Sequence, residues 1–253
     1  MKKTLKILGI FLLLVIGYFV MGMYTPVQYE APHMTPREST KYWQLSTGSR
    51  IAYTHLTSCD DMGAYPVIYL HGGPGGYVYS ENIKVLKPLT ELGFDVYLYD
   101  QIGSGLSKRL ENIAEYSVSR HIADLQGIIN KIDSKKVNLV GHSWGAVLAS
   151  TYAAHNPERV NAMVFSCPGS LKPEKETRSS LPVPDSLQLI RPYDPNSEAN
   201  SIALSPRFIG TVLYANVLGK KLAGDGEIDA FFTRMAMTFT KGMVCDSAKV
   251  WKE

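Results

Sequence analysis

Apolar residues follow two alternating periods along the chain. Short runs of Val, Ile, Leu and Tyr end in turns that contain Gly, Pro or Asp, and the segments between them place apolar residues at helical spacing. Strands are predicted at 66–70, 94–99, 137–142 and 160–165, and helices at 81–92, 119–132 and from 144 onward. Strands that alternate with helices predict a mostly parallel sheet with right-handed crossovers.

Two further strand-like segments precede this pattern. Residues 42–45 and 50–56 flank the sequence Ser-Thr-Gly-Ser at 46–49. Turn residues between two such runs are typical of a β-hairpin. We therefore expect an antiparallel hairpin before the parallel strands.

The chain opens with an apolar segment. Residues 7–23 carry no charge and follow three lysines, Lys2, Lys3 and Lys6. As a helix this run would be about 26 Å long, close to the thickness of a hydrocarbon core. We expect an uncleaved membrane anchor with the rest of the chain on the extracytoplasmic side, because lysines favour the cytoplasmic face. Cleavage after Gly22 would instead give a secreted protein.

The pattern changes again beyond residue 166. A polar, proline-marked stretch is followed by helical spacing at 208–218 and 228–238, without a clear strand. We interpret this part as a helical cap (lid) over the loops at the carboxyl ends of the parallel strands, where ligands bind in such sheets. The predicted organisation is a membrane anchor at 1–23, a proline-containing linker at 24–40, an α/β core at 41–166 and a cap at 167–253.

Charge and cysteine usage narrow the function classes. The net charge of +3 equals the charge of the three N-terminal lysines, so the rest of the chain is balanced. A nucleic-acid partner is not expected, since it would require a basic patch. Cys59, Cys167 and Cys245 match no metal-ligand spacing. The glycine-rich loop at 71–76 lacks the Gly-Lys-Ser/Thr ending of a phosphate cradle, so we expect no metal and no cofactor.

The motif that points most directly to a catalytic function is Gly141-His-Ser-Trp-Gly145. A β-branched run leads into this pentapeptide and helical spacing follows it, so a strand turns sharply into a helix on Ser143. Side chains at the two glycine positions would crowd neighbouring elements. A serine at a helix N-terminus lies where backbone N–H groups favour developing negative charge. Ser143 is therefore the candidate nucleophile.

Two further loops extend this motif. His71-Gly-Gly-Pro-Gly75 follows the first parallel strand, and Asp100-Gln-Ile-Gly-Ser-Gly105 follows the next. With these loops the chain resembles the α/β-hydrolase fold, and within it the proline iminopeptidase-like serine peptidases, over roughly residues 42–166. The resemblance implies that the backbone N–H groups of Trp144 and Gly73 form an oxyanion hole.

The chain departs from that family at one position of the second loop. Ile102 stands where the family's Asp-Gln-x-Gly sequence usually carries arginine, and an isoleucine cannot form the ion pairs of that arginine. We interpret Asp100 and Ser104 as residues that shape the loop rather than as catalytic groups.

The acid and base of a catalytic triad are not evident. In this fold they follow the serine in the order acid, then histidine. His155 is the one histidine after Ser143, and no acid lies between them. The resemblance implies two further strands that would carry both groups, so we expect them beyond residue 253. Asp246 is a weaker candidate for the acid, because its neighbours lack a strand-and-turn pattern.

Three functions follow from these observations. The leading one is a serine hydrolase that removes N-terminal residues, with proline as the candidate, from small peptides through an acyl-enzyme. Acids in the cap would then hold the free amino group of the substrate. The candidates for this role are Glu198, Asp225, Glu227 and Asp229. The alternatives are an esterase or lipase-like hydrolase and a catalytically inactive remnant that lacks the triad Asp and His.

Overall fold

The computed structural model describes residues 2–28, 34–60, 63–169, 171 and 197–243. Its contacts divide the chain into two compact units. One unit comprises residues 34–178, and the other combines residues 1–33 with 179–253. The two units are described separately below.

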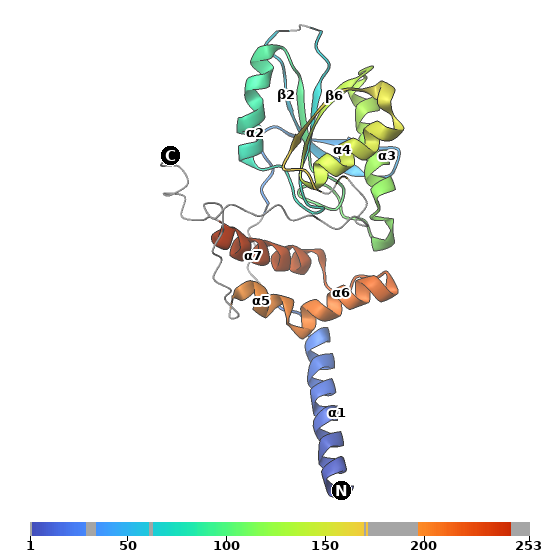
Figure 1. Ribbon diagram of the computed structural model, residues 1–253, viewed down its shortest axis with the longest axis vertical. Coiled ribbons are helices and arrows are strands. Elements are labelled where there is room, and N and C mark those ends of the chain that lie inside the picture. The colour runs from blue at the N-terminus through green and yellow to red at the C-terminus, as the bar shows by residue number, and fades with distance from the viewer. Residues whose placement is uncertain (1, 29–33, 61–62, 170, 172–196, 244–253) are drawn as a thin grey trace, which may run out of the picture. The chain divides into compact units, whose positions relative to one another are not determined.

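The first unit is built on a mixed sheet (Figure 1). Among its described residues the sheet has six strands in the order β1-β2-β4-β3-β5-β6. Their bounds are Thr40–Gln44 (β1), Arg50–Leu56 (β2), Val67–Leu70 (β3), Val96–Tyr99 (β4), Val137–His142 (β5) and Val160–Ser166 (β6). β1 and β2 form the predicted antiparallel hairpin, while β3 pairs in parallel with β4 and β5, and β5 with β6. The predicted mostly parallel sheet, with its N-terminal antiparallel hairpin, is confirmed.

Helices cover both faces of this sheet. Figure 1 shows α3 and α4 on one side and α2 on the other. Their bounds are Ser80–Leu86 (α2), Val118–Ile132 (α3) and Trp144–His155 (α4), with short 3₁₀ turns at Lys87–Leu92 (η1), Ile113–Glu115 (η2) and Pro157–Arg159 (η3). The helix predicted at 81–92 is present in two parts, an α-helix and a 3₁₀ helix. Pro88 lacks a backbone N–H and its ring clashes with the preceding turn, so the α-helix ends at Leu86 and continues as the 3₁₀ turn η1.

Each face of the sheet has its own apolar core. Alternate residues of one strand enter different cores, because side chains of a strand point to opposite faces. In β3, Ile68 and Leu70 pack with α3 and α4, whereas Val67 and Tyr69 pack on the side of α2. The loops that carry the candidate site follow the carboxyl ends of the parallel strands and lie outside both cores.

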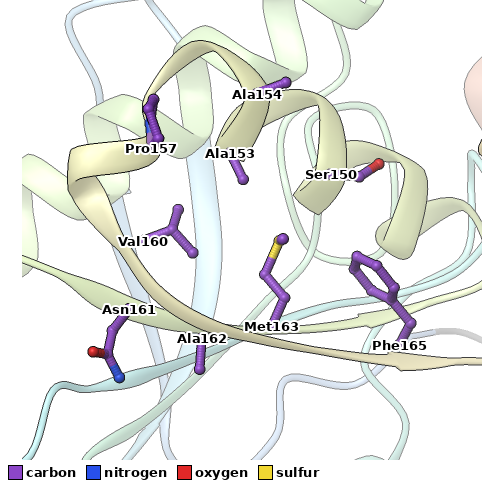
Figure 2. Close-up of a pocket in the computed structure, with 9 residues that line it drawn as sticks. All are labelled: Ser150, Ala153, Ala154, Pro157, Val160, Asn161, Ala162, Met163 and Phe165. Carbon is purple, nitrogen blue, oxygen red and sulfur yellow. The ribbon is translucent and has the colours of Figure 1, made fainter.

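Strand β6 is the edge of the described sheet. A hollow of about 620 Å³ lies between this strand and the C-terminal half of α4. Figure 2 shows Val160, Met163 and Phe165 projecting from β6 toward Ser150 and Ala153 of α4. The residues that line this hollow do not include the candidate nucleophile.

The second unit contains four helices among its described residues. They are Lys2–Tyr24 (α1), Glu198–Ala203 (α5), Pro206–Leu218 (α6) and Asp225–Met243 (α7). The helices predicted at 208–218 and 228–238 are present and longer than expected, while the six-residue α5 was not predicted. Phe208 packs edge-on against Phe231, with 5.6 Å between ring centroids, in a small apolar core of these helices.

Helix α1 is the one described helix that is long and apolar enough to cross a membrane. The qualifying segment is Thr4–Tyr24, with a mean hydropathy of 2.4, and the most apolar part of it is not buried against the rest of the protein. Its last turn is packed against α6. The positions of Gly22 and Gly210 show how close this packing is, because a Cβ at Gly22 would lie 3.0 Å from Pro206 and one at Gly210 would overlap Met23.

Candidate functional site

Ser143 lies on the sharp turn between β5 and α4. Its backbone has φ 51° and ψ −114°, a conformation that L-residues rarely adopt, and it is the N-cap residue of α4. The turn is held at both ends: the Ser143 N–H donates to the carbonyl of Ser166, and the Ser143 carbonyl accepts from the N–H groups of Ala146 and Gly169. A strained residue fixed in this way is typical of functional sites.

The glycines beside Ser143 are required by close packing. A Cβ at Gly141 would lie 2.6 Å from the backbone of Ala146, and one at Gly145 would overlap the carbonyl of Leu70 at the end of β3. The glycine-rich loop after β3 also lies close to the serine, since a Cβ at Gly72 would lie 3.2 Å from the Ser143 Cβ. The structure therefore brings the glycine-rich loop and the serine together.

Two backbone N–H groups, one on the Ser143 turn and one on the glycine-rich loop, have no acceptor among the described residues. Trp144 is the first residue of α4, where an N–H has no intrahelical partner. Gly73 adopts φ 133°, and its N–H donates to no other described residue. A Cβ at Gly73 would lie 2.6 Å from the Gly75 nitrogen, so another residue would not fit this turn.

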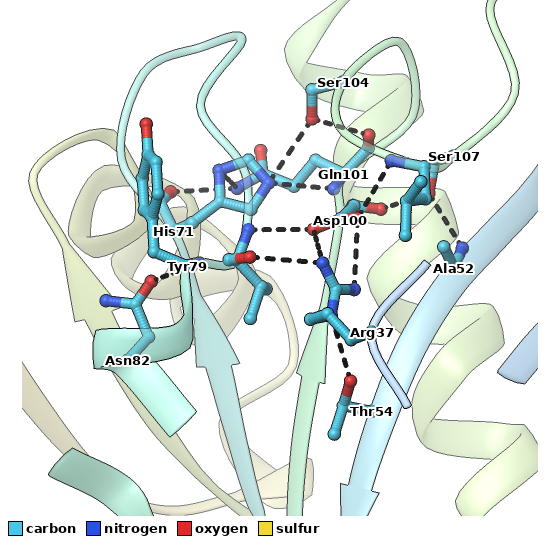
Figure 3. Close-up of polar contacts among 12 residues, drawn as sticks. Arg37, Ala52, Thr54, His71, Tyr79, Asn82, Asp100, Gln101, Ser104 and Ser107 are labelled. Carbon is cyan, nitrogen blue, oxygen red and sulfur yellow. Dashed lines mark hydrogen bonds and ion pairs between the residues drawn. The ribbon is translucent and has the colours of Figure 1, made fainter. Parts of the chain in front are cut away.

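Gln101 connects the three loops of the site. Its backbone N–H donates to Nε2 of His71 and its side-chain amide donates to the His71 carbonyl, both at 2.9 Å (Figure 3). Its side-chain oxygen accepts a bond of 3.0 Å from the indole N–H of Trp144. The residue after the serine is thereby linked to the first residue of the glycine-rich loop.

His71 is a buried, neutral histidine. Since Nε2 accepts from the Gln101 N–H, the proton belongs on Nδ1, which donates to the Gly72 carbonyl at 2.8 Å. Burial lowers the pKa of His71 to about 4, against the opposing effects of the Gly72 bond and the charge of Asp100. His71 therefore holds the glycine-rich loop in place, and no hydrogen bond joins it to Ser143 among the described residues.

Asp100 is fully buried and its charge is balanced by Arg37. The guanidinium lies 3.2 Å from Asp100 Oδ2, and the carboxylate also accepts from the backbone N–H groups of Val78 and Leu106 (Figure 3). Arg37 thus supplies a cation to a loop in which Ile102 replaces the family's usual arginine. Sequence reasoning missed Arg37, because it lies in the segment interpreted as a linker.

Serines complete the packing of the Asp100 loop. The Ser104 hydroxyl donates to the Gln101 carbonyl at 2.8 Å, and the Ser107 hydroxyl donates to the Asp100 carbonyl and accepts from the Ala52 N–H. Both side chains are buried. These bonds support the interpretation that Asp100 and Ser104 shape the loop.

No described histidine forms a hydrogen bond with the Ser143 hydroxyl. The ring of His121 packs edge-on against Trp144, with 6.1 Å between centroids, and burial lowers its pKa. The others contact Asp95 (His55), Ser166 (His142) and the Thr151 carbonyl (His155). His33 and the weaker acid candidate Asp246 lie outside the described residues.

Two of the cap acids are paired with cations of the protein. Arg207 forms two bonds with the Glu227 carboxylate, at 2.8 and 2.7 Å, and this pairing lowers the pKa of Glu227. Lys221 lies 2.9 Å from Asp225. A substrate amino group would have to compete with these pairs, so Glu227 and Asp225 are poor candidates for gripping it.

The described residues contain no group of three or more His, Cys, Asp or Glu that could hold a metal ion. Cys59 and Cys167 are exposed free thiols. Cys245 lies outside the described residues.

Comparison with known proteins points to one family. A family model of the alpha/beta hydrolase fold matches residues 65–199. A proline iminopeptidase of Heyndrickxia coagulans is 36% identical over 122 residues, which is 48% of this chain and 41% of that protein. A 2-hydroxy-6-oxononadienedioate/2-hydroxy-6-oxononatrienedioate hydrolase of Pseudomonas putida is 29% identical over 133 residues, 52% of this chain and 46% of that protein.

Among solved structures, a proline iminopeptidase-related protein of Thermus thermophilus is 25% identical. The alignment covers 52% of this chain and 45% of that chain, with a TM-score of 0.46. The chain spans less than half the length of the two curated relatives named above. The family assignment rests on the sequence matches.

Proposed function

This chain belongs to the α/β-hydrolase fold family, and from that premise we propose that it acts in a serine hydrolase with Ser143 as nucleophile. The observation that carries the proposal is the backbone of Ser143, which is held at φ 51° at the N-terminus of α4. Strained residues that the surrounding structure enforces are concentrated at functional sites. Here the strained turn would present the hydroxyl of the nucleophile, and two N–H groups of the neighbouring loops have no described acceptor.

The proposed reaction is acyl transfer. The Ser143 Oγ attacks the scissile carbonyl carbon, its proton passes to a base, and the negative charge develops on the former carbonyl oxygen. Collapse of this intermediate breaks the bond to the leaving amine or alcohol, which takes up the proton, and leaves an acyl-enzyme. Water then attacks the ester and regenerates the serine.

The oxyanion is assigned to the backbone N–H groups of Trp144 and Gly73. Neither group donates to a described residue, so both can bind a ligand oxygen. Such donors act strongly when they are preorganised, and the bonds of Gln101 hold their two loops in register.

The base is proposed to come from outside the described residues. Every described histidine has another neighbour, and none contacts the Ser143 hydroxyl. An acid and a histidine supplied by further chain would complete the triad in the order that this fold uses.

The proposed substrates are small peptides from which an N-terminal residue, with proline as the candidate, is removed. The relative from Heyndrickxia coagulans, named a proline iminopeptidase, supports this choice. The name of the Pseudomonas putida relative gives a different substrate class, so an ester or another carbonyl compound is the competing choice. The hydroxyl of Ser143 would serve either reaction.

We propose that the domain is anchored to a membrane by α1, with the catalytic part on the extracytoplasmic side. The length and exposure of Thr4–Tyr24 support the anchor, and the lysines before it support the orientation. The boundaries proposed for the remaining parts are the linker at 24–40, the core at 41–166 and the cap at 167–253.

A fluorophosphonate probe tests the nucleophile. We expect a chain that includes the segment supplying the acid and the histidine to be labelled on Ser143, with label detected by peptide mass spectrometry, and Ser143→Ala in the same chain to be unlabelled. Ser150→Ala, which removes a hydroxyl from the middle of α4, is the matched control and should keep the label. A chain that stays unlabelled at every probe concentration, while circular dichroism shows it folded, would support the inactive-remnant alternative.

Parallel substrate assays test the specificity. We expect turnover of a proline arylamide by preparations that the probe labels, and its loss in Ser143→Ala. Turnover of short acyl esters without turnover of the arylamide would reject the aminopeptidase proposal and leave an esterase.

A further inference from the structure

The end of α1 is built into the fold of the second unit. Arg207 is only 5% exposed and donates to the carbonyl of Met23 at 2.8 Å while its other N–H groups hold Glu227. The same carboxylate accepts from the N–H of Val27 at 3.0 Å. One buried ion pair therefore ties the last turn of α1 and the segment after it to the first turns of α6 and α7.

Because of these contacts, the first turn of α6 lies next to the end of α1, so the position of α1 in a membrane would also fix the position of that turn. Thr4–Tyr24 would be about 31 Å long as a helix, which matches the thickness of a hydrocarbon core. If α1 spans a bilayer, Met23 lies at the membrane surface. Arg207 and Gly210, which touch Met23, lie there too.

From this point α6 presents an apolar face to solvent. Leu213 is 51% exposed and Val217 is 75% exposed, and they are four residues apart on the same side of the helix. Val212 and Leu218 are also exposed. Val217 lies seven residues beyond Gly210, or about 10 Å along the helix, so the apolar face stays close to the end of α1.

The opposite side of α6 is occupied by the protein. Arg207 is buried there and Phe208 packs on Phe231 of α7, whereas Gly210, three residues before Leu213, lies on the side of the apolar face and contacts Met23 of α1. An apolar face opposite a protein-covered face is the pattern of a helix that lies in the membrane interface.

The ends of this surface carry residues suited to lipid headgroups. Tyr24, at the end of α1, is 57% exposed, and aromatic residues of this kind are enriched at membrane surfaces. Lys220 is exposed just after the C-terminus of α6, where its charge can reach phosphate groups.

We propose that helix α6 lies in the surface of the membrane that α1 enters, with Leu213 and Val217 inserted among the lipids. The proposal rests on the membrane anchor proposed above for α1. The occupant is a lipid surface, because the apolar face of α6 is continuous with the exposed apolar surface of α1. The second unit is then held to the bilayer by two helices rather than by one.

Site-specific fluorescence tests the proposal in the full chain. Cys59, Cys167 and Cys245 are replaced by serine, one cysteine is introduced, and the environment-sensitive dye NBD is attached. The labelled chain is reconstituted in phosphatidylcholine vesicles with or without bromine on the acyl chains, since bromine quenches only dyes that reach the lipid.

Three positions separate the outcomes. Val217→Cys reports on α6, Phe11→Cys reports on the anchor, and Val85→Cys is the matched control, because Val85 in α2 is also a valine with 75% exposure. We expect blue-shifted, bromine-quenched emission at positions 217 and 11, and neither effect at position 85.

Three results would overturn the proposal. Quenching at 11 but not at 217 would leave α1 as an anchor and place α6 in water. A blue shift at 217 without quenching would indicate a protein surface, such as a second copy of the chain, in place of lipid. Absence of quenching at 11 would reject the anchor itself, and with it the premise for α6, while leaving the hydrolase proposal untouched.

Discussion

The indole N–H of Trp144 donates a 3.0 Å hydrogen bond to the side-chain oxygen of Gln101, 43 residues earlier in the chain. Gln101 in turn binds the carbonyl of His71 through its amide group. These two bonds join the turn that carries Ser143 to the glycine-rich loop. The loops that carry the proposed oxyanion donors are thus held by a side-chain amide in addition to their close packing.

Trp144→Phe should loosen this connection. The phenyl ring keeps most of the packing but leaves the Gln101 oxygen without its donor, which is expected to cost about 1 kcal/mol of unfolding free energy. Displaced donors should slow fluorophosphonate labelling by about tenfold, less than the roughly 10²–10³-fold loss typical of removing an oxyanion donor. Urea unfolding followed by circular dichroism and timed labelling measure the two effects.

Trp43→Phe is the control for this substitution. Trp43 stacks on Tyr53, with 3.4 Å between ring centroids, and its indole makes no hydrogen bond among the described residues. It should change stability without changing the labelling rate. Equal labelling rates for Trp144→Phe and Trp43→Phe would reject the role given to Gln101.

Acidification should destabilise the fold through His71. Burial lowers its pKa from 6.5 to about 4, so the unfolded chain binds more protons than the folded chain between these values. The stabilisation by neutral His71 is therefore complete above pH 6.5 and is lost as the pH falls toward 4, by up to about 3 kcal/mol. The pKa of His121 is lowered as well, which adds to the same slope.

His71→Gln isolates this contribution. Its amide oxygen can accept from the Gln101 N–H but does not titrate, so the pH dependence of urea unfolding between 4 and 6.5 should become shallower. His155→Gln, which replaces an exposed imidazole at the end of α4, is the control and should leave the slope unchanged. The assignment fails if both variants give the same slope as the parent chain.

Removing the guanidinium of Arg37 should strongly destabilise the first unit. Arg37→Met leaves the buried carboxylate of Asp100 without a counter-charge, which is expected to cost about 3 kcal/mol or more. Adding Asp100→Asn to Arg37→Met removes the uncompensated charge and keeps an oxygen for the Val78 N–H. The double variant should therefore be more stable than Arg37→Met alone. Thermal unfolding of the two variants and of Lys41→Met, an exposed control, measures the difference.

The elements nearest the site could be predicted because their information is local. The Ser143 turn, the two glycines that flank it and the glycine-rich loop are each encoded within a few residues, and the period of the flanking runs identifies the strands. The break in the helix after Leu86 was also readable, since Pro88 lies within the predicted helical segment.

The ion pairs could not be predicted in the same way. Arg37 and Asp100 are 63 residues apart, and Arg37 lies in a proline-marked segment whose composition indicates a linker. Arg207 and Glu227 belong to different helices, so no helical spacing relates them. Such pairs depend on how the elements pack, and the composition of each segment carries no signal for the partner.

The backbone strain at Ser143 predicts a gain in stability when the proposed nucleophile is removed. At φ 51° and ψ −114° a side chain is unfavourable, and such a residue costs on the order of 1–3 kcal/mol. Ser143→Gly should relieve this strain, although glycine also raises the entropy of the unfolded chain by about 0.5–1 kcal/mol. Ser143→Ala keeps the Cβ and is the matched control. We expect both variants to lose probe labelling, and the glycine variant to have the higher unfolding free energy, by about 1 kcal/mol, in urea titrations. If alanine proved as stable as glycine, the turn would not be strained by the side chain, and the argument from strain to function would lose its basis.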